Sequence, residues 1–207
     1  MNIFPYRVRF SKTGKMRFLS HHDVLRMFER ALRRTGLPLR MTEGYNPHPI
    51  LSFPTALGLG IESLDEVMEF ELSTWTAPRA ILQQLGAQLP DGFAVTGVEA
   101  FARQARSFVD FVEYEADAPG QGGGVADRIR DFLGRAEARI ERKSDKGTKT
   151  VEIRQYVIGL EAEGEKIFLR IRVTDAGTAK PEEVLRTIGI EPARARVRKT
   201  YTEVGTR

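Results

Sequence analysis

Residues 4–10 read Phe-Pro-Tyr-Arg-Val-Arg-Phe, an alternation of large apolar and charged side chains. Because successive side chains of a strand point to opposite faces of a sheet, this pattern predicts a β-strand with one buried face. The chain then turns at Thr13-Gly14, and we expect a short strand at 15–19. The stretch therefore begins a sheet whose apolar face needs a covering layer.

The covering layer is expected directly afterwards, as an amphipathic helix. Ser20 or Asp23 can cap its start, and Gly36 followed by Pro38 ends it. Apolar residues recur at helical spacing between these limits: Val24, Leu25, Phe28, Ala31 and Leu32. Such a stripe packs against a sheet, so the chain opens with a strand and the helix that buries it.

The rest of the chain completes this pattern and then repeats it. The first half has further expected strands at 37–41, 50–53, 67–72 and 93–101, with a helix from Pro78. Its order, β-α-β-β-α-β with an inserted loop, is the ferredoxin-like pattern.

The second half has expected strands at 107–116, 138–143, 150–160, 166–173 and 193–200, and helices at 125–136 and 181–188. We therefore predict an α+β protein of two tandem ferredoxin-like units with antiparallel sheets. The expected domains are residues 1–104, which carry the histidines, and residues 105–207.

Composition narrows the classes of function. With 41% hydrophobic residues, the 207-residue chain can bury the cores of two domains of about 100 residues each. The absence of cysteine excludes disulfides, thiolate metal sites, iron–sulfur clusters and thiol catalysis. No apolar run approaches the roughly 20 residues that span a bilayer, and the N-terminus lacks a signal-peptide pattern. We therefore expect a cytoplasmic protein without a membrane partner.

Two motifs hold all three histidines of the chain. Residues 20–23, Ser-His-His-Asp, begin the first helix, and residues 44–49, Gly-Tyr-Asn-Pro-His-Pro, form a loop restrained by two prolines. A rigid loop that displays Tyr45, Asn46 and His48 is suited to stacking on and hydrogen bonding to an unpaired base. The alternative is a wide turn whose tyrosine packs on the sheet.

Arginines follow the same helix. Arg26, Arg30 and Arg33 continue the face of His22 at intervals of four, four and three residues, so they lie one turn apart. Such a row can follow a phosphate backbone. The alternative is an ordinary solvated helix face, on which Glu29 offsets part of the charge.

Other arginines lie on expected strands. Arg7 and Arg9 are expected beside the strand of Glu69 and Glu71, so cross-strand ion pairs would neutralise them. The last strand carries a set with fewer obvious partners: Arg194, Arg196 and Arg198. With a net charge of +4, this set makes a polyanion partner one interpretation, and a solvated basic surface the other.

The histidines leave several roles open. Neighbouring helical positions diverge by about 100°, so His21 and His22 do not easily converge on one atom. A metal site of His21, His48 and Asp23 matches no standard spacing, and we expect no metal and no cofactor. His21, His22 and His48 remain candidates for a general base in RNA cleavage. Hydrogen bonding to the loop backbone is the structural alternative.

These motifs resemble a known family. Residues 18–23 (FLSHHD), 28–38 (FERALRRTGLP) and 44–49 (GYNPHP), followed by Ser52-Phe53, are similar to the radical-SAM-linked domain of unknown function. The similarity is specific over about residues 4–75 and loose elsewhere. That family occurs alone or fused behind a cobalamin-type radical SAM protein, often encoded near ribonuclease E/G. The resemblance implies a bacterial cytosolic protein, a radical SAM partner and a role in RNA metabolism.

The order of elements is also similar to that of paired ferredoxin-like CRISPR repeat-processing endoribonucleases, a likeness of fold alone. Taken together, these observations predict an RNA-binding or substrate-presenting partner of a radical SAM enzyme that acts in RNA modification or processing and is not itself an enzyme. The predicted RNA contacts are Arg26, Arg30, Arg33, Tyr45, Asn46, His48, Arg194, Arg196 and Arg198. Two alternatives remain: a metal-independent endoribonuclease with a histidine base, and a protein–protein docking module.

Overall fold

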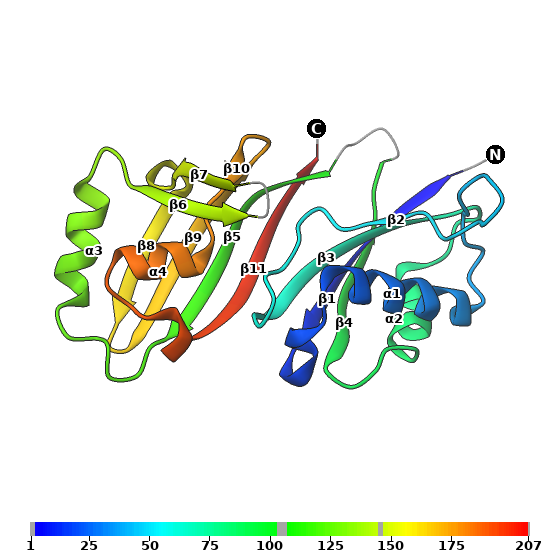
Figure 1. The fold of residues 1–207 in the computed structure, drawn as a ribbon. Helices are drawn as coiled ribbons and strands as arrows, with labels where there is room; N and C mark the ends of the chain where they lie inside the picture. Colours follow the sequence, from blue (N-terminus) through cyan, green and yellow to red (C-terminus); the bar gives the residue numbers. More distant parts are fainter. Residues whose placement is uncertain (1–2, 103–106, 145–146, 207) are drawn as a thin grey trace. The chain divides into compact units, whose positions relative to one another are not determined.

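The alternating residues at the start of the chain form strand β1 (Phe4–Lys12). The structure is a computed structural model that describes residues 3–102, 107–144 and 147–206. The chain divides into two compact units (Figure 1). Unit 1 is Met1–Phe108 with Val204–Arg207, and unit 2 is Val109–Glu203. The boundary predicted between residues 104 and 105 falls outside the described residues.

The sheet of unit 1 is built around β1. This strand pairs antiparallel with β3 (Glu62–Leu72) on one side and with β4 (Phe93–Ala100) on the other. The short β2 (Leu51–Ser52) pairs antiparallel with β3. The resulting order is β4-β1-β3-β2, with every neighbouring pair antiparallel.

Helices α1 (His21–Thr35) and α2 (Pro78–Gly86) pack on one face of this sheet (Figure 1). The side chains that alternate inward on the two central strands meet the apolar stripes of both helices. The large side chains most deeply buried in this core are Tyr6, Val8, Phe10, Phe28, Leu32, Met68, Phe70, Leu72, Ile81 and Leu85. Burial of so many large side chains, each contributing roughly 1.5–3 kcal/mol, makes the strand–helix layer the stable part of unit 1.

Both residues expected to cap α1 do so together. The Asp23 backbone N–H donates to Ser20 Oγ, and the Ser20 N–H donates to the Asp23 carboxylate, each at 3.2 Å. This capping box begins the helix, and Gly36 ends it with a left-handed φ of 73°. The Ser20 hydroxyl hydrogen bond holds the pKa of Asp23 below its usual value.

Two expected strands of unit 1 are absent as strands. Residues Gly14–Phe18 form the 3-10 helix η1, because Met16 N–H bonds back to Thr13 O (3.2 Å) and Leu19 N–H to Met16 O (3.0 Å). Residues 37–41 make only isolated bridges. Local turn hydrogen bonds thus replace pairing at residues 14–18, whereas residues 37–41 keep single backbone contacts with neighbouring segments and no continuous ladder.

Unit 2 also contains antiparallel strand pairs and has its own helices. Its elements are β5 (Ser107–Asp117), α3 (Val125–Gly134), β6 (Arg139–Ser144), β7 (Gly147–Glu152), η2 (Arg154–Tyr156), β8 (Val157–Glu163), β9 (Lys166–Thr174), β10 (Gly177–Thr178), α4 (Pro181–Thr187), η3 (Pro192–Arg194) and β11 (Arg196–Thr206). The main strands are ordered β8-β9-β5-β11, β10 extends β9, and β6–β7 form a separate hairpin.

Two predictions for unit 2 are corrected by 3-10 turns. The single strand expected at 150–160 is split by η2, where Arg154 donates to Leu133 O (2.9 Å) and Val157 O (3.0 Å). Arg194 lies in η3, which Pro192 begins, and not on the final strand. It therefore does not share a strand face with the arginines of β11.

The predicted α+β class with antiparallel sheets is confirmed by these elements, which include four α-helices in the described part of the chain. None of the helices in residues 3–102, 107–144 and 147–206 has the length and apolar character to cross a membrane.

Candidate functional site

The second motif forms a small closed hairpin. Thr42 N–H donates to His48 O (2.8 Å), and His48 N–H donates to Thr42 Oγ1 (3.1 Å). Met41 and Pro49 form an antiparallel bridge at its base. An ion pair between Arg40 and β3 ties the base to the sheet. The tip is therefore held by hydrogen bonds at its base and by the restricted backbone of its prolines.

The tip of this hairpin presents its side chains to solvent. Tyr45 is 100% exposed, and Asn46 and His48 are also exposed. Gly44 adopts a φ of 121°, which side chains rarely tolerate and glycine does. The interpretation that the tyrosine packs on the sheet is therefore wrong, and its whole ring is open for stacking.

Arg33 joins this hairpin to α1. Its Nη2 donates to Pro47 O at 2.7 Å, so the loop lies beside the last turns of the helix. Arg26 and Arg30 are exposed on the preceding turns. At 1.5 Å of rise per residue, Arg26 and Arg33 are separated by about 11 Å along the helix axis. The predicted arginine row and the predicted aromatic loop thus form one continuous surface.

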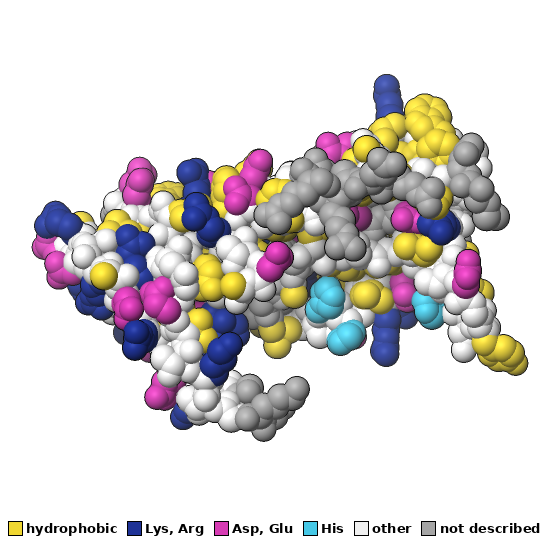
Figure 2. Space-filling view, turned by 90° about the horizontal axis from the view of Figure 1, so that it is seen from above, with side chains coloured by type: hydrophobic (Ala, Val, Ile, Leu, Met, Phe, Trp, Pro, Cys, Tyr) yellow, Lys and Arg dark blue, Asp and Glu magenta, His cyan; other side chains and the backbone are white. Residues whose placement is uncertain are grey.

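The three histidines do not gather at one point. His21 and His22 lie on the first turn of α1, with ring centroids 6.0 Å apart, and Figure 2 shows one pair of histidines with a third apart from it. His48 belongs to the hairpin held by Arg33, about 18 Å further along the helix. Within the described ranges, no three histidine, aspartate or glutamate side chains are grouped to hold a metal ion.

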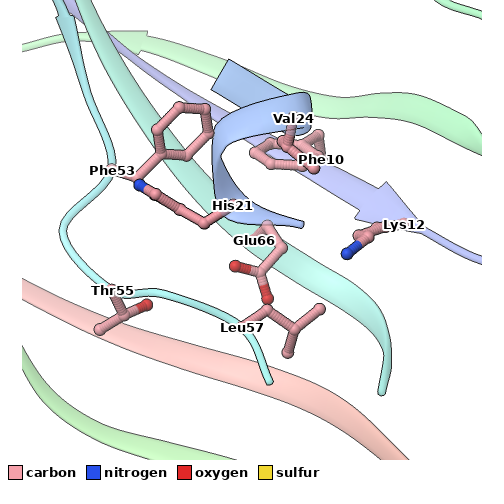
Figure 3. A pocket seen from close by; sticks show the side chains of 8 residues that line it. All are labelled: Phe10, Lys12, His21, Val24, Phe53, Thr55, Leu57 and Glu66. Carbon is pink, nitrogen blue, oxygen red and sulfur yellow. The ribbon is translucent and has the colours of Figure 1, made fainter. Parts of the chain in front are cut away.

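A small pocket lies at the start of α1 (Figure 3). Its cavity of about 20 Å³ is large enough for one water molecule. The residues that line this pocket come from β1, β3, α1 and the segment that includes and follows Phe53. They are Phe10, Lys12, Glu66, His21, Val24, Phe53, Thr55 and Leu57. The first motif therefore contributes to a pocket of its own, distinct from the hairpin.

Lys12 and Glu66 are charged residues at the edge of the core. They are 3% and 4% exposed, and Glu66 lies next to Phe10 in the register of β1 and β3. Lys12 Nζ donates to Leu19 O at 2.8 Å and so fixes the chain just before α1. Burial lowers the pKa of Lys12, and the charge of Glu66 partly offsets this. Neither residue was among the predicted site residues, although each lies one step further along the inward-facing row of its strand.

His21 lies at the mouth of this pocket. Its ring is edge-on to Phe53, with centroids 5.4 Å apart, and Phe53 also contacts Phe10 and Phe28 of the core. Phe53, which follows the second motif, thus supports the imidazole of the first. An exposed imidazole above a buried amine and carboxylate can take up or release a proton at the rim of a water-sized cavity.

The other predicted arginines are spread over different surroundings. Arg7 lies opposite Glu69 and pairs with it (3.0 Å), as predicted, while Arg9 pairs with Asp65 (2.6 Å) and Glu71 pairs at the base of the hairpin. The cross-strand neutralisation expected on β1 is therefore present.

The C-terminal arginines lie in unit 2. Arg194 is exposed in η3, and Arg196 and Arg198 are exposed on β11. The hydrogen bond that Lys166 donates to Glu115 raises the pKa of Lys166, and the charge of Arg198 acts against this. The three arginines therefore belong to a different unit from Arg33 and the hairpin.

We predict that Lys12 and Glu66 are energetically coupled. Lys12→Met removes a buried positive charge that interacts with Glu66, together with the hydrogen bond to Leu19 O, and should lower the free energy of unfolding by about 1–3 kcal/mol, whereas Lys12→Met with Glu66→Leu should recover part of it. Because the folded-state pKa of Lys12 lies below 10.5, the unfolded chain binds this proton more tightly. The stability of wild type relative to the double variant should therefore rise as pH approaches 10.5.

Urea denaturation between neutral pH and pH 10.5 measures both effects. Arg130→Met, which breaks an exposed pair with Asp127, is the matched control and should cost less than about 1 kcal/mol. Additive losses in the double variant would show that the two buried charges are independent.

Comparison with known proteins places the chain in a family. No curated protein matches it. A family model does match residues 5–185, a range that includes both histidine motifs, the pocket and most of unit 2. The chain therefore belongs to the family DUF2344, which is described as an uncharacterized protein conserved in bacteria.

Proposed function

We propose that the protein binds single-stranded RNA through the hairpin surface, defined as Arg26, Arg30 and Arg33 of α1 with Tyr45 and Asn46 of the hairpin. One observation carries this proposal, the hydrogen bond from α1 to the hairpin backbone, because it fixes a fully exposed aromatic ring at the end of a row of cations. Single-stranded nucleic acids are bound by this combination, in which rings stack on bases and basic side chains follow the backbone.

The side chains of this surface suit two kinds of contact, one with phosphates and one with bases. Arginines neutralise phosphates, which gives affinity that depends on salt and not on sequence. Tyr45 can stack on any base, and Asn46 beside it offers both a donor and an acceptor to a base edge. His48 lies at the hairpin base with its backbone already bonded to Thr42, so its ring alone is left for a ligand.

We also propose that each unit is ferredoxin-like. Two observations support this: the strand orders β4-β1-β3-β2 and β11-β5-β9-β8 correspond position by position, and each unit runs β-α-β-β-α-β once the β6–β7 hairpin and the short β10 are set aside. In such units the helices cover one face of the sheet and leave the other open.

The RNA proposal predicts two separable losses. Arg26→Ala with Arg30→Ala should make the slope of log affinity against log salt less negative by about 1.4, because two phosphate contacts with a single strand are lost. Tyr45→Ala should weaken binding by about 1–3 kcal/mol with the slope unchanged, since stacking releases no counterions. Fluorescence anisotropy of a labelled unstructured RNA, measured over a salt series, gives both numbers.

Arg79→Ala with Arg130→Ala is the charge-matched control, because both side chains are exposed and belong to other helices, α2 and α3. It should leave the affinity nearly unchanged. An equal loss in this control, or no binding by wild type at low salt, would overturn the proposal.

We further propose that the bound RNA is presented to a radical SAM enzyme. The similarity of the two motifs to the radical-SAM-linked domain is the support for this partner. Because the chain has no cysteine, it lacks the ligands of the cluster and the radical chemistry would belong to the partner.

Co-expression with a cobalamin-type radical SAM protein of the same genome tests the partner. We expect the two proteins to co-purify after nuclease treatment, both with wild type and with Tyr45→Ala. Loss of the complex with Tyr45→Ala would instead make the hairpin a protein-docking module. Separation of wild type from the partner after nuclease treatment would contradict a direct complex.

A second candidate function has its own observation. His21 lies at the mouth of a pocket floored by buried Lys12 and Glu66, which is a setting for proton transfer. Cleavage of RNA by its own 2′-hydroxyl needs a base, an acid and cationic stabilisation of the phosphorane, and no metal. The candidate is therefore a metal-independent endoribonuclease centred on His21.

Incubation of RNA with the pure protein in a chelator distinguishes the two functions. If the second candidate is right, cleavage occurs, is lost in His21→Gln and persists in His48→Gln, because His48 lies at the far hairpin. Thermal unfolding of both variants controls for folding. Intact RNA at every pH from 5 to 9 would remove this candidate and leave binding.

A further inference from the structure

The open face of the sheet in unit 2 carries aromatic and charged side chains in alternating register. On β5 and β9 the buried positions include Val112 and Leu169, so the intervening residues point to the other face. There Phe111, Glu113 and Glu115 lie opposite Arg172, Arg170 and Phe168, respectively. Two rings and two arginines therefore occupy the central strands of this face.

Arg170 is held in one orientation on this face. Its Nε donates to Glu113 Oε1 at 2.7 Å, its Nη2 lies 2.6 Å from the same oxygen in an ion pair, and its guanidinium carbon lies 5.1 Å from the centroid of the Phe111 ring. The Arg170 side chain nevertheless remains 53% exposed. The planar group thus has a ring beside it and stays open to solvent, so it is available to a second planar partner.

A groove of about 340 Å³ runs beside this guanidinium. Its lining comes from all four main strands of unit 2 and includes Glu113, Gly159, Glu161, Phe168, Arg170 and Thr200. A Cβ added at Gly159 would lie 3.1 Å from Arg170 Cβ, so the glycine leaves space for the arginine to lie flat. The volume is at the lower end of the range for small-ligand sites, enough for one aromatic group.

The charges of the groove select against phosphate. Glu113 compensates Arg170, and the exposed Glu161 adds a carboxylate that accepts hydrogen bonds and repels anions. A carboxylate is a good partner for the exocyclic amino group of a base, as it is for the amino group of cytosine. The groove therefore fits a neutral planar heterocycle with an amino group better than it fits a phosphate.

We infer that this groove binds one unpaired base that carries an exocyclic amino group, stacked on Arg170 and in contact with Phe168. This second contact rests on the proposed RNA-binding function for its ligand class, but on none of the residues of the hairpin surface. The hairpin surface supplies affinity that is independent of sequence, and the groove supplies preference for adenine or cytosine over uracil.

Binding of labelled oligoadenylate, oligocytidylate and oligouridylate by the full chain tests the inference. We expect wild type to bind the first two about tenfold more tightly than oligouridylate. Arg170→Lys, which keeps the charge and loses the plane, should abolish this preference and leave the salt slope unchanged. Arg172→Lys is the matched control, because Arg172 is exposed on the same face but does not line the groove, and it should keep the preference.

The two proposals fail in different ways. If the hairpin surface does not bind RNA, Arg26→Ala with Arg30→Ala has no effect on the salt slope, whereas the base preference persists. If the groove does not bind a base, wild type has no preference or Arg170→Lys retains it, whereas the hairpin variants still weaken binding. Binding of free adenosine monophosphate that Arg170→Lys abolishes, with no preference among the oligomers, would assign the groove to free nucleotides and overturn the RNA assignment.

Discussion

The packing of α1 on the inward row of β1 is the contact on which unit 1 depends. Tyr6, Val8 and Phe10 are at most 1% exposed because the apolar stripe of the helix covers them. Once the helix lies along this row, both of its ends are fixed. Its first turn stands over Lys12, the next inward residue of the strand, and its last turn reaches the hairpin through Arg33. The pocket and the hairpin surface are thus two consequences of one packing arrangement.

The sequence could predict those elements whose structure is determined by a local pattern of residues. The alternation of residues 4–10 gives β1, and the helical spacing with Ser20 and Gly36 gives α1 to within its caps. The pocket could not be found in this way, since Glu66 meets Phe10 only through the long-range register of two strands. The relation of the histidines also depends on a long-range contact, the one that places the second motif beside the far end of α1. The strand predicted at residues 15–19 was wrong for the opposite reason, because local turn hydrogen bonds outweighed a weak strand pattern.

The number of charged residues alone would not have located the hairpin surface or the groove of unit 2. The net charge is only +4, and many arginines serve the fold: Arg7 pairs within the sheet, Arg142 pairs with the largely buried Glu183 at 2.7 Å, and Arg154 bonds to backbone carbonyls. What distinguishes Arg26 and Arg30 is their exposure on the helix whose Arg33 holds the hairpin of the fully exposed Tyr45. A binding surface in this protein is therefore recognised by which cations the fold leaves accessible, and not by how many it contains.

Both units contain an arginine that contacts an aromatic ring and pairs with a carboxylate, but the two arginines differ in exposure. In unit 1 the Arg7 guanidinium lies 5.1 Å from the Phe101 ring and pairs with Glu69 and Glu99, but its side chain is only 6% exposed. In unit 2 Arg170 lies at the same distance from Phe111 and pairs with Glu113, yet it is 53% exposed. The same trio of arginine, ring and carboxylate is a closed structural cluster in one unit and an open planar surface in the other. Since the interactions that orient the guanidinium are alike, accessibility is the property that separates a stabilising contact from a site able to accept a base.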